Sequence, residues 1–267
     1  MAALSAGTRW VVILGASSGF GAAAARAFAA AGHPIFGVHL DRRGAMPAVE
    51  ALVAELRGTG VRVHFHNGNA ADDEERGRAL AGFRAQLDPD DEVGVLLHSL
   101  AFGTLRPMFP TPDNQAVLGR KHLEMTLDVM ATSLVYWSQD LVAGGQLGRG
   151  GRVYAMTSSG SLAAWPQYGA ISAAKCALES YVRQLAIELA PRGITANAIL
   201  AGVTRTPALE KIPGADEIAR RALERNPHGR LTTPDDVAHC LVALASAGTA
   251  WMTGNVLRID GGESVSG

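Results

Sequence analysis

A glycine-rich turn near the start of this 267-residue chain constrains its fold more than any other feature. Residues 10–14 (WVVIL) lead directly into Gly15, Gly19 and Gly21, and the alanine-rich stretch AAAARAFAAAG follows. A continuous β-branched run is typical of a strand buried on both faces, and alanine favours a helix. Glycines between a strand and a helix let backbone amides approach a pyrophosphate at the helix N-terminus. The sequence therefore predicts a dinucleotide-binding turn, with contacts from Gly15, Ser17, Ser18, Gly19, Phe20 and Gly21.

Alternating strand and helix patterns continue along the rest of the chain. We expect further strands at residues 34–40, 61–65, 93–98, 152–156, 194–200 and 255–259. We expect helices at residues 122–142, from residue 175 to about 192, within residues 207–226, and at residues 235–245. Strands that alternate with helices form a parallel sheet covered on both faces. The predicted fold class is α/β, a Rossmann-type doubly wound seven-stranded parallel sheet, in a single NAD(P)-binding domain over residues 1–267.

The composition narrows the classes of function. A net charge of -1 does not indicate a nucleic-acid partner. Cys176 and Cys240 are the only cysteines, and they form neither a metal-ligand spacing nor a disulfide framework, as expected in a reducing compartment. The start MAALSAGTRW is too short and polar for a signal peptide, and no apolar run approaches the ~20 residues of a membrane span. We expect a cytoplasmic protein with no metal and no membrane partner.

The residues after the second predicted strand bear on the choice of cofactor. An acidic residue there, here Asp41, usually holds the adenosine ribose of NAD, whereas arginines, here Arg42 and Arg43, accept the 2′-phosphate of NADP. Two adjacent arginines pair well with a phosphate, so NADP(H) is favoured over NAD(H). A solvated helix start is the alternative reading of the two arginines.

Other predicted cofactor contacts follow the later strands, at the carboxyl edge where open α/β sheets bind ligands. They are Asn69 and Ala70, then Ser99, Leu100 and Ala101, and finally Ala201, Gly202, Val203, Thr204 and Thr206. Phe102 is the predicted substrate contact in the same loop as Ser99.

The candidate catalytic groups lie in TSSGSLAAWPQYGAISAAK, residues 157–175. Tyr168 precedes Lys175 by seven positions, and at ~100° per residue seven steps return to the same face of a helix. A phenol with a pKa of ~10 becomes a useful acid–base group when a nearby ammonium stabilises its phenolate. The plain structural alternative is a tyrosine packed at a helix start beside a solvated lysine. Ser158 completes the predicted catalytic set of Tyr168, Lys175 and Ser158.

Taken together, the motifs GASSGFG, TSSGS, AGVTRT and IDGG resemble the short-chain dehydrogenase/reductase superfamily over essentially the whole chain. Within it, the Tyr-x6-Lys pair, HSLAFG and NAILAGVTRT are similar to the enoyl-acyl-carrier-protein reductase branch, most of all to its NADPH-dependent form. The resemblance implies reduction of a trans-2-enoyl thioester, on a carrier protein or CoA, to the saturated acyl thioester in fatty acid biosynthesis. It also implies a homotetramer, with apolar helices around residues 122–142 and 176–190 as the interface.

Three positions depart from the ordinary pattern of the superfamily. Ile171 stands four before Lys175, where most members carry the catalytic tyrosine, and Met130 stands where ketoreductases carry a catalytic asparagine. Both changes agree with the enoyl branch. Ser158, however, is retained where ketoreductases carry a catalytic serine. A carbonyl reductase or alcohol dehydrogenase of the same superfamily is therefore the first alternative, and a non-catalytic NADP(H)-binding regulator is the second.

The resemblance also assigns roles to individual residues. Tyr168 is expected to hydrogen-bond the enolate oxygen of the substrate, and Lys175 to hold the nicotinamide ribose. Thr204 and Thr206 are expected to position the carboxamide and the diphosphate. Because a carrier protein is usually acidic, a group of arginines is a candidate docking site for it, with a solvated helix face as the alternative reading. These arginines are Arg205, Arg220, Arg221 and Arg225.

Overall fold

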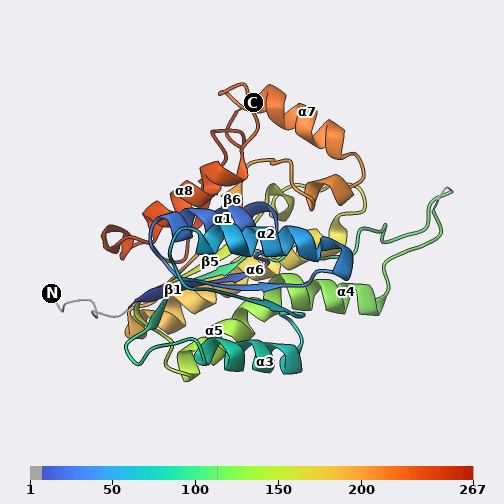
Figure 1. Cartoon of the computed structure of the whole chain (residues 1–267). Helices are drawn as coiled ribbons and strands as arrows, with labels where there is room; N and C mark the ends of the chain where they lie inside the picture. The colour runs from blue at the N-terminus through green and yellow to red at the C-terminus, as the bar shows by residue number, and fades with distance from the viewer. Residues whose placement is uncertain (1–7, 113, 267) are drawn as a thin grey trace.

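The computed structural model describes residues 8–112 and 114–266 (Figure 1). Within these residues, seven parallel strands form one sheet in the order β3-β2-β1-β4-β5-β6-β7. This topology confirms the predicted doubly wound α/β fold. The strands are β1 (Arg9–Leu14), β2 (Ile35–His39), β3 (Val63–Asn67), β4 (Glu92–His98), β5 (Leu147–Thr157), β6 (Thr195–Ala201) and β7 (Val256–Ile259).

Helices cover both faces of the sheet because the central strands are apolar on both sides. On β1, Trp10, Val12 and Leu14 point into one core layer, and Val11 and Ile13 point into the other. The first layer packs against α3 (Asp73–Arg84), α5 (Ser133–Ala143) and α6 (Gly169–Leu189). The second packs against α1 (Gly19–Ala30), α2 (Met46–Arg57) and α8 (Pro234–Leu244).

The helix predicted over residues 122–142 is wrong as a single element. The chain forms α4 (Arg120–Leu127), then a wider π turn over Asp128–Thr132, and then α5. The hydroxyls of Thr132 and Ser133 donate to the carbonyls of Asp128 and Val129, at 3.1 and 2.9 Å. Such bonds from side chains to the backbone compete with the regular helical ladder and bend helices. The π turn brings Met130 toward the candidate site, where it packs with Ile171.

Other boundaries also differ from the prediction. Strand β3 begins two residues later than expected, and β5 begins five residues before the predicted 152–156 and ends one residue after it. Helix α7 (Ala215–Arg225) fills only the second half of residues 207–226, because prolines and glycines hold the first half in loops and one 3-10 turn. In Figure 1, the proline-rich segment before α4 projects from the body of the protein. Phe109 in this segment is 80% exposed. Among the described residues, no helix has both the length and the apolar character to cross a membrane.

Candidate active site

The glycine turn after β1 is shaped by two close backbone approaches. Gly15 has φ +88, and a Cβ there would stand 2.6 Å from the carbonyl oxygen of Ser99. A Cβ on Gly21 would stand 2.0 Å from the carbonyl oxygen of Gly15. Any side chain at these two positions would push apart the turn, the first turn of α1 and the end of β4. The turn therefore has the backbone cradle that a dinucleotide requires.

The N-terminus of α1 is suited to bind a phosphate group. Its N-cap, Ser18, has an extended backbone and makes no side-chain capping bond, so its hydroxyl does not occupy the N–H groups of the first turn. Thr206, from the loop after β6, lies beside this turn, since a Cβ on Gly19 would be 3.6 Å from its Cγ2. The fold thus joins two predicted diphosphate contacts from distant parts of the chain. A nicotinamide dinucleotide fits this edge of the sheet.

The loop after β6 is held by the C-terminal end of the chain. The carboxylate of Glu263 is buried and accepts the N–H of Val203 at 2.9 Å. Burial raises the pKa of this carboxylate. Thr204 Oγ1 donates to the carbonyl of Gly202 at 3.0 Å. These contacts set the backbone of three predicted cofactor residues.

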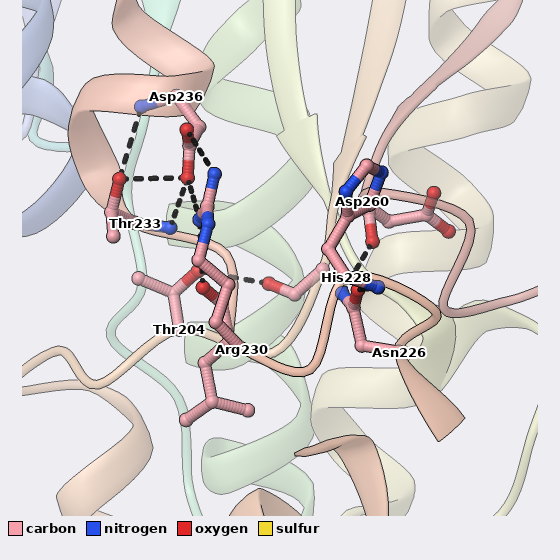
Figure 2. Close-up of polar contacts among 9 residues, drawn as sticks. Thr204, Asn226, His228, Arg230, Thr233, Asp236 and Asp260 are labelled. Carbon is pink, nitrogen blue, oxygen red and sulfur yellow. Dashed lines mark hydrogen bonds and ion pairs between the residues drawn. The ribbon is translucent and has the colours of Figure 1, made fainter. Parts of the chain in front are cut away.

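Two further groups of hydrogen-bonded residues lie near this loop. Figure 2 shows Thr204 near two bonded groups, one that joins Asn226, His228 and Asp260 and one that joins Arg230, Thr233 and Asp236. Arg230 and Asp236 form a paired ion bridge at 2.6 and 2.9 Å at the start of α8. Asn226 Nδ2 donates to the carbonyl of Asp260 at 3.1 Å. These bonds tie the segment before α8 to the start of α8 and to the residue that follows β7.

Tyr168 lies at the N-cap of α6, one residue before its first helical residue, Gly169. It follows a turn in which its N–H donates to the carbonyl of Trp165 at 3.1 Å. Pro166 and then Gln167, with φ +64, occupy the centre of this turn, which is the pattern of a type II turn. A left-handed conformation is unusual for a residue other than glycine, asparagine or aspartate. The turn, and not a helix that runs back to Tyr168, sets the position of the phenol.

The surroundings of Tyr168 favour the neutral phenol. Burial raises its pKa, and the hydroxyl of Ser158 acts in the opposite direction. The structure thus brings together Tyr168 and Ser158, two of the three predicted catalytic residues.

Lys175, the third predicted catalytic residue, lies in α6 and is almost completely buried. Its Nζ donates to the carbonyl of Met156 on β5 at 2.7 Å. Burial lowers its pKa to about 8, against an opposing effect from the Glu179 carboxylate, which itself accepts a bond from Thr157 at 2.6 Å. A lysine with this pKa exchanges its proton near neutral pH.

Between Tyr168 and Lys175, the helix presents an apolar surface. Ile171 is 7% exposed and packs in a cluster with Met130, Val129 and Ala174, with Tyr168 at its margin. Gly103, in the loop after β4, fits tightly against this cluster, because a Cβ there would be 2.8 Å from Ile171 Cγ1. The position of the usual tyrosine therefore carries neither an acid nor a hydroxyl.

Comparison with known proteins agrees with this geometry. A match to the family described as enoyl-(acyl carrier protein) reductase covers residues 15–264. The chain belongs to the short-chain dehydrogenase/reductase superfamily. Membership in this superfamily makes the protein an oxidoreductase that uses a nicotinamide cofactor.

The relatives of this short-chain dehydrogenase/reductase differ in their reactions. The 1-cyclohexenylcarbonyl-CoA reductase of Streptomyces collinus is 33% identical over 150 residues, which are 55% of this chain and 53% of the relative. The L-rhamnose 1-dehydrogenase (NAD(P)(+)) of Azotobacter vinelandii is 30% identical over 260 residues, which are 94% and 95% of the two chains.

A third relative has a known structure. The NADH-dependent enoyl-[acyl-carrier-protein] reductase FabI of Aquifex aeolicus is 30% identical over 175 residues, which are 66% of this chain and 63% of the relative. The crystal structure of that enzyme superposes with a TM-score of 0.79 at 24% identity and covers 98% of each chain. At this identity, the superposition establishes the fold.

Two further histidines of this oxidoreductase lie at strand ends near the site, and no role was predicted for either of them from the sequence. His98, the last residue of β4, is fully buried, and its Nε2 is 2.9 Å from Ser133 Oγ. Burial and the nearby charge of Lys175 lower its pKa to about 3, so His98 is neutral at physiological pH. His39, the last residue of β2, bonds Asp41 at 2.9 Å. A polar residue that ends an apolar strand is the sequence signal that would have identified both.

The arginines predicted as a carrier-protein docking site are paired with carboxylates in this oxidoreductase. Arg205 bridges Glu210 and Asp216 at 3.1 and 2.8 Å. Arg220 and Arg221 both bridge Glu217, at 2.8 and 2.6 Å, and this environment lowers the pKa of Glu217 to about 2. Helix α7 carries three acidic and three basic residues, so its net charge is close to zero. Docking of an acidic carrier at this surface stays a prediction.

Proposed function

We propose that this protein is an NADPH-dependent reductase of enoyl thioesters. The observation that carries the proposal is the separation between the acid and the usual tyrosine position. The only phenol in residues 157–175 belongs to Tyr168, at the N-cap of α6, while Ile171, four positions before Lys175, has an apolar side chain. The family match over residues 15–264 supports the same reading.

The reduction of an enoyl thioester requires a proton donor that is displaced from the usual tyrosine position. The bound nicotinamide cofactor supplies a hydride, which an enoyl substrate accepts at its β-carbon. Negative charge then develops on the thioester carbonyl oxygen, two carbons away, whereas a ketone carries its oxygen on the carbon that is reduced. A hydroxyl that serves the enoyl substrate must therefore lie further from the nicotinamide. Tyr168 precedes Ile171 and meets this requirement, and its O–H donates a hydrogen bond to the enolate oxygen, worth ~3 kcal/mol.

Tyr168 and Lys175 have separate roles in this proposal. The phenol is buried enough to stay protonated, and it can therefore donate a hydrogen bond at neutral pH. Lys175, with a pKa of about 8, is largely charged at pH 7, and in this proposal it exchanges its bond to Met156 for the ribose hydroxyls of the cofactor. The α-carbon of the enolate takes its proton from water or from Tyr168, which completes the saturated product.

NADP(H) is the proposed cofactor, since Arg42 and Arg43 follow β2 and are exposed. Two guanidinium groups beside the adenosine ribose complement a 2′-phosphate. NAD(H) is the alternative cofactor, because the relative from Aquifex aeolicus uses NADH.

The test is oxidation of NADPH by the purified protein, with crotonyl thioester and acetoacetyl thioester in parallel. Oxidation with the crotonyl substrate alone is expected. Tyr168→Phe should then lower kcat by about 100-fold and leave the Kd for NADPH unchanged, because a lost oxyanion donor costs ~3 kcal/mol. Loss of NADPH affinity in that variant would contradict the role of Tyr168 as the acid.

A carbonyl reductase is the second candidate, because Ser158 is close enough to Tyr168 to influence its pKa. The L-rhamnose 1-dehydrogenase relative, matched along nearly its whole length, supports it as well. Oxidation with the acetoacetyl thioester alone would establish this function. NADPH binding without turnover of either thioester would favour a regulator.

A further inference from the structure

The carboxylate of Asp41 is bonded to a buried imidazole behind it. His39 Nδ1 lies 2.9 Å from Asp41 Oδ2. The His39 side chain is 2% exposed, and its ring lies 5.9 Å from that of Phe65 inside the fold. Asp41 itself is only 24% exposed, although it follows the end of β2 at the edge of the sheet. One carboxylate oxygen therefore points back toward the sheet.

The backbone of Asp41 is fixed by the neighbouring strand. Asn67, the last residue of β3, pairs in register with His39. Its side-chain amide accepts the N–H of Asp41 at 3.0 Å and donates to the carbonyl of Asp41 at 3.0 Å. With both backbone groups of Asp41 held, its carboxylate can move only by rotation of its own side chain. The bond to His39 restrains that rotation.

Neither of the two arginines that follow Asp41 forms an ion pair with its carboxylate. Arg42 and Arg43 are exposed, and neither forms an ion pair among residues 8–112 and 114–266. An ion pair with Asp41 would offset the positive charge of the arginine that formed it. Because His39 holds Asp41, both guanidinium groups stay available to an anion.

We propose that His39 sets the cofactor preference of this site as a positioning residue that acts through Asp41. By drawing the carboxylate back toward the strand, His39 removes a negative group from the place where a 2′-phosphate binds. Arg42 and Arg43 then supply the positive charge that the phosphate needs. The inference rests on the proposed function only in that the site binds NADP(H).

Binding of cofactor fragments tests the proposal without any enoyl substrate. The probes are adenosine 2′,5′-bisphosphate and ADP, titrated by calorimetry into the wild type and into His39→Phe. Released Asp41 should repel the 2′-phosphate, so the affinity for the bisphosphate should fall by about tenfold, as expected for a lost charge-assisted contact. The affinity for ADP should stay the same or rise. His64→Phe, on the adjacent strand, is the matched control and should change neither affinity.

A double variant separates a positioning role from a structural one. In an Asp41→Ala background, His39→Phe should have no effect on bisphosphate affinity, because there is no carboxylate to release. His39→Asn, which keeps an N–H donor near the position of Nδ1, should retain most of the wild-type preference.

A fall that persists without Asp41, or a fall in ADP affinity alone, would overturn the proposal. If the wild type does not reduce the enoyl thioester but the variants show the expected affinities for the bisphosphate and ADP, enoyl reduction is refuted and the role of His39 is supported.

Discussion

The ring of Tyr168 lies against the backbone of Gly160, so closely that a Cβ on Gly160 would stand 2.4 Å from Tyr168 Cε1. The same Cβ would be 3.2 Å from Ser158 Oγ. Gly160 is in the 3-10 turn that follows β5, and its φ is not in the left-handed region. The backbone would therefore accept alanine at this position, but the phenol would have to move.

Gly160→Ala should lower kcat with the enoyl thioester by about 10- to 100-fold, because a displacement near 1 Å disturbs the alignment of a catalytic group. The Kd for NADPH and the melting temperature should change little. Gly77→Ala in α3, where an added Cβ meets nothing within 4 Å, is the control. Full activity in Gly160→Ala would show that the position of Tyr168 does not limit turnover.

Lys175→Met should make the protein more stable and inactive. Burial that lowers the pKa of Lys175 from 10.5 to about 8 costs about 3 kcal/mol at pH 7, and loss of the bond to Met156 offsets about 1 kcal/mol. The free energy of urea unfolding should rise by about 2 kcal/mol at pH 7.

The pH dependence of the unfolding free energy should also differ between the wild type and Lys175→Met. The native state binds the Lys175 proton less tightly than the unfolded chain, so the wild type should gain stability as the pH rises from 8 to 10.5. In Lys175→Met this gain should be missing. Equal slopes for the two proteins over this range would contradict the depressed pKa.

His98→Phe should flatten the loss of stability in acid. The unfolded chain binds a proton on this imidazole near pH 6.5, whereas the buried imidazole, with a pKa of about 3, does not. Stability that depends on neutral His98 is complete above pH 6.5 and declines as the pH falls toward 3. Between pH 7 and pH 4.5, unfolding by urea should lose about 3 kcal/mol less in the variant than in the wild type. His239→Phe, at an exposed position of α8, should leave the wild-type slope unchanged.

Trp165→Phe should loosen the start of α7. The indole N–H donates to the carbonyl of Pro213 at 3.0 Å, and the ring packs on Gly214, the N-cap of α7. Phenylalanine keeps a ring and removes one hydrogen bond worth ~1 kcal/mol, so the start of α7 should open about fivefold more often. Limited proteolysis should therefore become faster within residues 207–225. Trp251→Phe, at a site that is 99% exposed, is the control, and an equal change there would remove the assigned role of Trp165.

The sequence alone was enough to predict the secondary structure around the glycine turn and the parallel sheet. The apolar run of β1 and the glycines Gly15, Gly19 and Gly21 predict a strand and a turn, because apolar character and the conformational freedom of glycine are properties of the residues themselves. The order of such units then leads to a parallel sheet, and the carboxyl ends of its strands bring the predicted cofactor residues to one edge. The seven-residue spacing of Tyr168 and Lys175 likewise predicted, from the sequence alone, that both side chains belong to one site.

Only the tertiary structure decided how these residues are held. The sequence could not show that Tyr168 caps α6, that Gln167 adopts a left-handed turn, or that His39 bonds Asp41 behind the site. Nor could it show that Arg205 and Arg220 are paired with carboxylates. Each of these features depends on burial or on a partner brought close by folding, and neither the desolvation that shifts a pKa nor the distance that makes a hydrogen bond is a property of one residue type.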